Sequence, residues 1–148
     1  MPVNSFKPIS ETTLRAALRD KLAEVLPNAV VLIHEEDVTK GAEAGVPDMS
    51  VTHGGKTLWI ECKYGTMRRP WKSRDIQQRT AIRLARHGLC FYLLWEQGDG
   101  DRRTVVVHPK YLYHATEHGM IADGFNHQFV ANLIRGMLQP EKGGNRDL

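Results

Sequence analysis

Long apolar runs are missing from this chain of 148 residues, and no stretch approaches the roughly 20 consecutive apolar residues that a membrane-spanning helix needs. The opening segment, MPVNSFKPIS, also lacks the apolar stretch of a secretory signal peptide, so we expect a protein that works in the cytoplasm of its cell or host. Cysteine is scarce: Cys62 and Cys90 belong to no CxxC pair and to no Cys/His cluster. This argues against a zinc site and favours two buried, reduced thiols.

Internal repeats and low-complexity tracts are absent as well, so nothing indicates a repeat architecture. What the chain does contain is an ordinary globular composition, with 41% hydrophobic and 25% charged residues. Its length fits one domain, residues 1–148, with one hydrophobic core. We expect the core to span about residues 10–108 and a helical C-terminal extension to span about residues 109–140.

Positive charge is concentrated in one part of the sequence. The net charge is only +3, yet lysines and arginines crowd the segment from Arg68 to Arg86, where Asp75 is the single acid. This asymmetry favours an anionic partner on one face, although such a segment can also be a solvated surface. The candidates for contacts to nucleic-acid phosphates are Arg68, Arg69, Lys72, Arg74 and Arg79, with Trp71 among them as a stacking aromatic.

Periodicity divides the chain into elements in the order α-β-β-β-α-β-β, followed by further helical segments. Behind the N-cap candidate Ser10, an apolar stripe that includes Leu14 and Leu18 predicts a helix that stops at Pro27. Ser73 is the predicted N-cap of a second helix, and Gly88 is its stop. Strands are predicted over residues 29–33, 48–52, 57–63, 89–95 and 103–108, a turn over 53–56, and helices over 73–86, 109–118 and 126–138. This order predicts an α/β fold with a central mixed sheet flanked by helices.

The hairpin over residues 48–63 brings ionisable side chains together. Asp48 begins one strand, and antiparallel pairing around the turn places it opposite the Glu61 region. Glu61 and Lys63 are two residues apart and share one face, whereas Cys62 points into the core. Two close carboxylates repel each other unless a cation lies between them, and the backbone carbonyl of Cys62 can add an oxygen ligand. Oxygen ligands in a partly open site favour Mg²⁺, with Mn²⁺ as a substitute.

The same residues also have a purely structural interpretation. Asp48 can simply begin a strand after Pro47, and Glu61 with Lys63 can form an ion pair on a solvated face. The apolar segment Leu58–Ile60 before Glu61 favours a half-buried setting, and therefore a functional site. In such a site a metal ion would activate a water and neutralise a scissile phosphate. Lys63 would orient or deprotonate that water, or stabilise the transition state.

Two short motifs resemble those of a known family. Val46-Pro47-Asp48 followed by Ile60-Glu61-Cys62-Lys63 resembles the signature of the PD-(D/E)xK nuclease superfamily. Further positions are similar to its VRR-NUC branch, which is common in phage genomes and related to Holliday-junction resolvases; these are Gly45, Trp59, Ser73, Gln77, Leu84 and Gly88. The resemblance covers about residues 10–95 and implies a restriction-endonuclease-like core. It also implies that Gln77, with Gln78 in reserve, contributes to the active site, and that Glu11 completes the metal shell.

One segment departs from the VRR-NUC pattern. That branch often has an arginine–asparagine pair after the first helix, where this chain reads His34-Glu35-Glu36-Asp37. The departure weakens the assignment to the branch more than the assignment to the superfamily. It also makes Glu35 and Glu36 further candidates for metal ligands.

The resemblance implies a Mg²⁺-dependent endonuclease that hydrolyses phosphodiester bonds in DNA and recognises DNA structure rather than sequence. Branched or junction DNA is the expected substrate, and a homodimer would match its two symmetric strands, with the C-terminal helices as the dimer surface. If a phage encodes the protein, its compartment is the host cytoplasm. One alternative is a nuclease for flaps, ends or single strands without junction preference. Another is a catalytically silent nucleic-acid-binding or inhibitor protein on the same fold.

Overall fold

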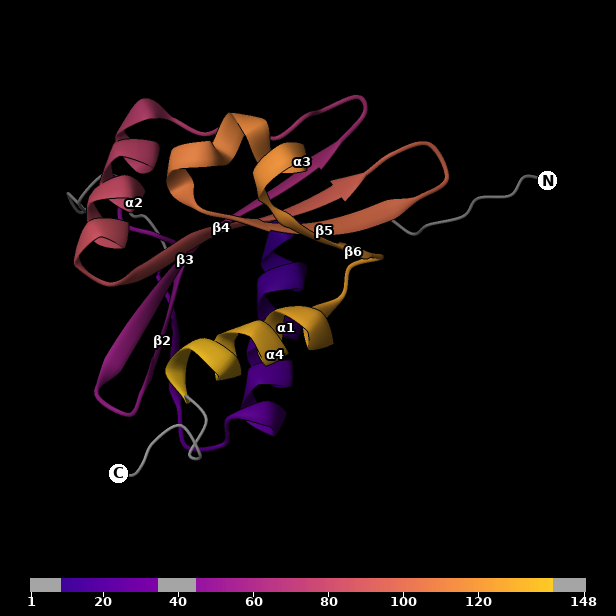
Figure 1. The fold of residues 1–148 in the computed structure, drawn as a ribbon. Helices are drawn as coiled ribbons and strands as arrows, with labels where there is room; N and C mark the ends of the chain where they lie inside the picture. Colours follow the sequence, from indigo (N-terminus) through magenta and orange to yellow (C-terminus); the bar gives the residue numbers. More distant parts are fainter. Residues whose placement is uncertain (1–8, 35–44, 140–148) are drawn as a thin grey trace.

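The computed structural model describes residues 9–34 and 45–139, which form a six-stranded sheet flanked by helices (Figure 1). The strands are β1 (Val30–Ile33), β2 (Met49–His53), β3 (Lys56–Thr66), β4 (Leu89–Gln97), β5 (Arg102–Val107) and β6 (Met120–Asp123). The helices are α1 (Glu11–Val25), α2 (Asp75–His87), the 3-10 helix η2 (Pro109–His114), α3 (Ala115–His118) and α4 (His127–Leu138). Across these ranges, no helix has the length and apolar character needed to cross a membrane.

The six strands lie in the sheet in the order of the sequence. Neighbouring strands are antiparallel with one exception, the parallel pair β3 and β4, which α2 connects. A parallel pair needs such a crossover, because a tight turn cannot return the chain to the same edge of the sheet. The mixed sheet and the α/β class predicted from the sequence are therefore confirmed. The carboxyl ends of β3 and β4 meet at one edge, beyond Lys63.

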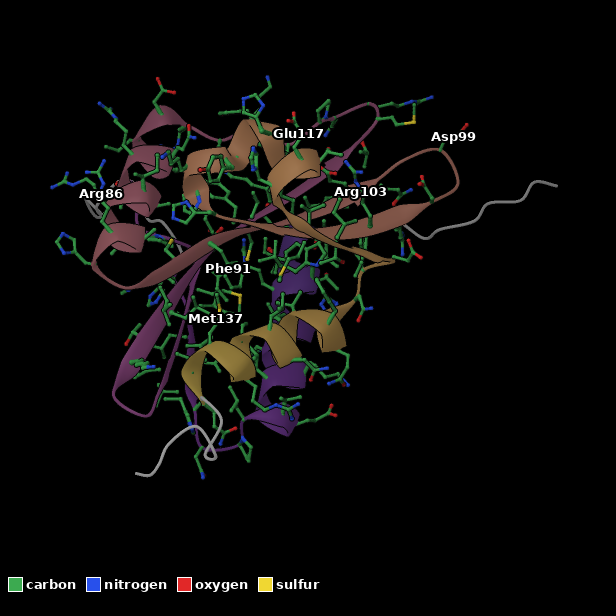
Figure 2. All side chains as sticks on the ribbon, viewed as in Figure 1. Arg86, Phe91, Asp99, Arg103, Glu117 and Met137 are labelled. Atoms are coloured by element: carbon green, nitrogen blue, oxygen red, sulfur yellow. The ribbon has the colours of Figure 1, made fainter. Side chains whose placement is uncertain are left out.

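Side chains alternate between two cores on the two faces of the sheet. Ile60 and Cys62 of β3 pack with Phe91 of β4 on the face covered by α1 and α4. Tyr92 packs on the opposite face, which α2 and η2 cover, with Trp59 at its margin. Figure 1 shows these helices on the two sides of the sheet, and Figure 2 shows Phe91 between the sheet and α4. By the same alternation, Glu61 and Lys63 lie on the α2 face.

Helices α1 and α4 are held by their caps and by one shared core. The hydroxyl of Ser10 accepts a hydrogen bond from the backbone N–H of Thr13 at 3.1 Å, so the predicted N-cap of α1 is confirmed. The Asn126 side chain caps α4 in the same way. The buried residues of α4 are Val130, Ala131, Ile134 and Leu138, and all belong to the core that includes α1. The C-terminal helices were expected to form a dimer surface. The apolar side of α4, however, is packed within the chain.

Three expectations about secondary structure were wrong in detail. Arg74, not Ser73, is the N-cap of α2, and the Ser73 hydroxyl instead lies 2.6 Å from the hydroxyl of Tyr92. The segment after residue 108, expected to be helical, also contains β6, which pairs with β5. Strands β3 and β4 continue to Thr66 and Gln97, beyond their expected ends, because they pair with each other along that length.

Gly65 allows the chain to fold back closely after β3. A Cβ atom at this position would collide with the backbone nitrogen of Trp71. We predict that Gly65→Ala lowers the free energy of unfolding by about 1–3 kcal/mol, because a backbone neighbour cannot move aside as a flexible side chain can. Urea denaturation measures the change. Gly136→Ala is the control, since no atom lies within 4 Å of the added methyl group in α4. Equal midpoints for the two variants would contradict the prediction.

Candidate active site

The strand hairpin brings Asp48, Glu61 and Lys63 to one place, as the spacing of the motif predicted. Met49 pairs with Ile60, so Asp48 adjoins the next residues of β3. Its Oδ2 atom accepts a hydrogen bond of 2.8 Å from the backbone N–H of Cys62. Lys63 Nζ lies 3.6 Å from Glu61 Oε2. The Cys62 side chain is fully buried in the other core, also as predicted.

Glu61 is the most unusual residue of the cluster. It is 1% exposed, and neither oxygen of its carboxyl group has a hydrogen-bond partner among the described residues. Burial, followed by repulsion from Asp48, raises the pKa of Glu61 from 4.5 to about 8, and the nearby Lys63 offsets only part of that rise. Burial also raises the pKa of Asp48, against the hydrogen bond from Cys62. The pair is therefore short of positive charge despite Lys63.

Gln77 holds the lysine from the α2 side. It is only 8% exposed, and its Oε1 atom accepts hydrogen bonds from Lys63 Nζ at 2.9 Å and from the backbone N–H of Arg74 at 3.1 Å. The second bond ties the Gln77 side chain to the first turn of α2, so the helix fixes the position of the lysine. Gln78, the reserve candidate, points elsewhere and donates to the carbonyl of Pro109.

Glu11 joins the cluster from the start of α1, accompanied by an arginine that sequence analysis did not single out. Burial and the charge of Asp48 raise the pKa of Glu11, and the charges of Arg15 and Lys63 and the backbone N–H of Tyr64 on β3 offset part of that rise. Arg15 Nη1 lies 2.6 Å from Glu11 Oε1 and 3.9 Å from Asp48 Oδ1. The spacing of four residues between Glu11 and Arg15 is a helical ion-pair signal that was present in the sequence. Arg15 partly neutralises Glu11, so Glu11 is a weaker candidate for a metal ligand than Asp48 or Glu61.

The acidic cluster fits a magnesium ion that is only partly enclosed by protein. Within residues 9–34 and 45–139, no three His, Cys, Asp or Glu side chains form a ready-made metal site. Mg²⁺ is commonly held by one or two carboxylates, with waters and substrate phosphates as its other ligands. The unpartnered oxygens of Glu61 suit this role, beside Asp48. The Cys62 carbonyl lies on the same side of β3 as its N–H, which donates to Asp48. Glu35 and Glu36 lie outside the described residues.

The basic residues proposed to contact phosphates are all exposed, and they lie along the loop after β3 and the first turns of α2. They are Arg68, Arg69, Lys72, Arg74 and Arg79. Trp71, between them, is partly buried and stacks on Tyr113 with ring centroids 6.0 Å apart. The loop begins after Thr66, three residues past Lys63. At its far end, the backbone N–H of Arg74 donates to Gln77, which also contacts Lys63.

The buried acids make the stability of the metal-free protein depend on pH. The pKa of Glu61 rises from 4.5 to about 8 on folding, so the folded protein holds this proton more tightly than the unfolded chain does. The stabilisation is complete below about pH 4.5 and is lost as the pH rises through about 8. The raised pKa values of Asp48 and Glu11 act in the same direction.

We predict that thermal unfolding in EDTA shows a loss of stability on the order of 1–4 kcal/mol between pH 5 and pH 8, and that Glu61→Gln removes most of it. Differential scanning fluorimetry across this pH range measures the effect. Glu24→Gln is the matched control, since the Glu24 side chain is 69% exposed and should leave the pH profile unchanged. Parallel profiles for wild type and Glu61→Gln would rule out Glu61 as the titrating group.

The fold and the cluster define a class of protein: an α/β domain with a mixed six-stranded sheet, and a buried glutamate and a partly buried aspartate beside a lysine. No protein-family model and no curated protein matches the sequence of this chain. The interpretation of the site therefore rests on the geometry and chemistry of its own residues.

Proposed function

We propose that this chain is a Mg²⁺-dependent nuclease with a restriction-endonuclease-like fold, related to the VRR-NUC branch of the PD-(D/E)xK superfamily. The observation that carries the proposal is the Glu61 carboxyl group, which is buried without a hydrogen-bond partner beside Asp48 and Lys63. Burying such a group costs several kcal/mol unless a cation compensates it. Strongly perturbed carboxyl groups of this kind cluster at functional sites. The mixed sheet with flanking helices is compatible with the proposed fold.

Asp48 and Glu61 would hold the metal ion, with the Cys62 carbonyl as a third oxygen donor and Glu11 within the same cluster. When bound, Mg²⁺ supplies charge neutralisation at the scissile phosphate and lowers the pKa of a water. Asp48 is already oriented for this task, because the Cys62 N–H fixes one of its oxygens. The other oxygen lies 3.9 Å from Arg15 Nη1, beyond hydrogen-bond distance, so it is not committed to that donor.

Lys63 acts in this proposal as a hydrogen-bond donor. Its Nζ atom donates a hydrogen bond of 2.9 Å to Gln77 Oε1 and lies 3.6 Å from Glu61 Oε2, an ion-pair distance. A donor placed between these two groups can orient the attacking water or stabilise charge on the phosphate. This arrangement favours those two roles over deprotonation of the water. Gln77 is the positioning residue that aims the ammonium group.

The basic loop after β3 indicates a nucleic-acid backbone as the substrate. Exposed arginines next to a phosphate-cleaving site contact the backbone and carry no sequence information. We therefore propose cleavage of DNA selected by structure, with branched or junction DNA as the substrate. A homodimer would present two such sites to the two strands of a junction.

A panel of labelled substrates tests the proposal. Purified protein is incubated with duplex, single-stranded, flap and four-way DNA in Mg²⁺, in Mn²⁺ or in EDTA. We expect cleavage in both metals and none after chelation. Preference for the four-way substrate would support junction cleavage, and preference for single strands or flaps would support the alternative nuclease. Binding without cleavage under every metal condition would favour the silent binding protein.

We predict that Gln77→Ala lowers kcat by about 10- to 100-fold, because an untethered Lys63 samples other conformations. KM should change much less, since the Gln77 side chain is buried and contacts Lys63 and the first turn of α2. Gln77→Glu keeps an acceptor at the same place and should retain more activity than alanine. The neighbouring Gln78→Ala is the control. If Gln77→Ala and Gln78→Ala have the same kcat, Gln77 is not a positioning residue.

A further inference from the structure

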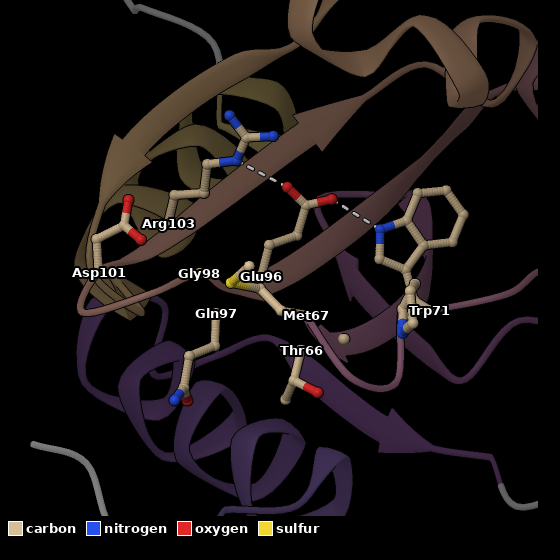
Figure 3. A pocket seen from close by; sticks show the side chains of 10 residues that line it. Thr66, Met67, Trp71, Glu96, Gln97, Gly98, Asp101 and Arg103 are labelled. Atoms are coloured by element: carbon tan, nitrogen blue, oxygen red, sulfur yellow. Dashed lines mark hydrogen bonds and ion pairs between the residues drawn. The ribbon is translucent and has the colours of Figure 1, made fainter. Parts of the chain in front are cut away.

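A cavity of about 280 Å³ lies just beyond the acidic cluster, where β3 and β4 end (Figure 3). Its walls include the side chains of Met67 and Trp71 from the loop after β3, and Asp101 and Arg103 from the β4–β5 turn and β5. The crevice outside the carboxyl ends of parallel strands is a common place for ligands in α/β proteins. The cavity is slightly smaller than the roughly 300–1,000 Å³ of most ligand pockets. It can receive one nucleotide, but not a base pair.

The cavity and the acidic cluster share one face of the sheet. Gly65 follows Lys63 by two residues and therefore lies on the same side of β3. Gly65 pairs with Glu96 of β4, and Glu96 pairs with Arg103 of β5, which continues a row across that face. Adjacent strands are about 4.8 Å apart, so the row reaches only about 10 Å from Gly65. A strand bound at the acidic cluster can thus extend into the cavity within a nucleotide or two.

Glu96 fixes the two side chains that would recognise a ligand. Its Oε1 atom accepts a hydrogen bond from Arg103 Nε, and its Oε2 atom accepts one from Trp71 Nε1, both at 2.7 Å. Figure 3 shows Glu96 between the two groups. The carboxylate is therefore committed to positioning. The two terminal nitrogens of Arg103 bond to no other group in the described part of the chain, and they remain donors for a phosphate.

The opposite side of the cavity supplies apolar surface. Met67 is 69% exposed, and its thioether side chain lines the cavity. Trp71 is braced by the stacked ring of Tyr113 and is held in place without any ligand. A fixed aromatic ring and an adaptable thioether side chain beside an arginine suit the flat face of a nucleobase.

We propose that this cavity is a subsite for one unpaired nucleotide of the strand to be cut, with its base against Trp71 and Met67 and its phosphate on Arg103. The inference rests on the proposed nuclease function and narrows its substrate to DNA with at least one unpaired nucleotide beside the scissile bond. A fully paired base cannot enter the cavity, because its partner strand would have to enter with it. Flaps and gaps offer such a nucleotide, and a junction offers one where the pairs at its centre open, whereas a blunt duplex does not.

Equilibrium binding tests the subsite apart from catalysis. Lys63→Ala protein in Mg²⁺ serves as the uncleaving background, and fluorescence anisotropy measures its Kd for a 12-nucleotide single strand and for the matching blunt duplex. On this background Arg103→Gln and Met67→Ala should each weaken single-strand binding by about 5- to 50-fold and change duplex binding by less than about twofold. Arg135→Gln on α4 is the matched control, because it removes the same charge from the other face of the sheet.

Two outcomes would overturn the subsite: unchanged single-strand binding in both variants, or equal losses for single strand and duplex. The nuclease proposal fails in a different way, through wild-type protein that cuts no substrate in Mg²⁺. Selective losses in an inactive protein would keep the nucleotide subsite and remove the nuclease function. Cleavage by the wild-type protein without selective losses of binding in the variants would keep the nuclease function and remove the nucleotide subsite.

Discussion

Replacing Asp48 by asparagine is expected to slow Mg²⁺-dependent DNA cleavage by about 10³-fold or more. Asparagine has nearly the shape of aspartate, and its side-chain oxygen can still accept the hydrogen bond from the Cys62 N–H. The substitution therefore removes a metal-binding charge from the site but leaves the hairpin in place. Single-turnover cleavage rates at saturating protein measure the loss, with the unfolding midpoint as a check on the fold.

Asp99→Asn provides the matched control for this experiment. Asp99 is exposed in the turn between β4 and β5 (Figure 2), and replacing it by asparagine makes the same change of charge outside the acidic cluster. The control variant should cut at the wild-type rate. If Asp48→Asn also keeps its activity within about tenfold while remaining folded, Asp48 does not hold a catalytic metal.

Lys63→Ala is expected to reduce the rate of the chemical step by about 10²- to 10⁴-fold while metal binding persists. The two effects separate because Lys63 lies beside Glu61 and is not itself a metal ligand. Removing the ammonium group also removes a competing cation, so Mg²⁺ should bind the variant at least as tightly as it binds wild type. Lys56→Ala, at the exposed start of β3, is the control for loss of a lysine. Weakened metal binding in Lys63→Ala would assign the lysine a structural role.

The sequence was most informative where the structure is local. The hairpin followed from Gly54 and Gly55, which adopt φ angles of 61° and 79° that favour glycine and join His53 directly to Lys56. Once that turn is set, the period of two residues along a strand leaves little freedom for the acids and the lysine. The convergence of Asp48 with the Glu61 region could therefore be predicted without any knowledge of the remaining fold.

Features that depend on distant contacts could not be predicted in this way. Ser73 was expected to cap α2. Its hydroxyl group is instead hydrogen-bonded to the hydroxyl group of Tyr92, which lies 19 positions further along the chain. The strand β6 is short and largely exposed, so it has no clear periodicity, and its pairing with β5 defines it. The cavity beyond Gly65 depends on Arg103. This residue lies near Gly65 only because β4 pairs with both β3 and β5. Each of these features follows from tertiary packing, which a local pattern does not encode.

Diffraction from crystals grown with Mn²⁺, recorded for anomalous signal, tests the central claim most directly. The account predicts one strong peak between the carboxylates of Asp48 and Glu61, at a coordination distance of about 2.1 Å from an oxygen of each. The same peak should disappear in crystals of Asp48→Asn. An active protein that shows no metal at this position, with the Lys63 ammonium group filling the space between the two acids, would contradict the account.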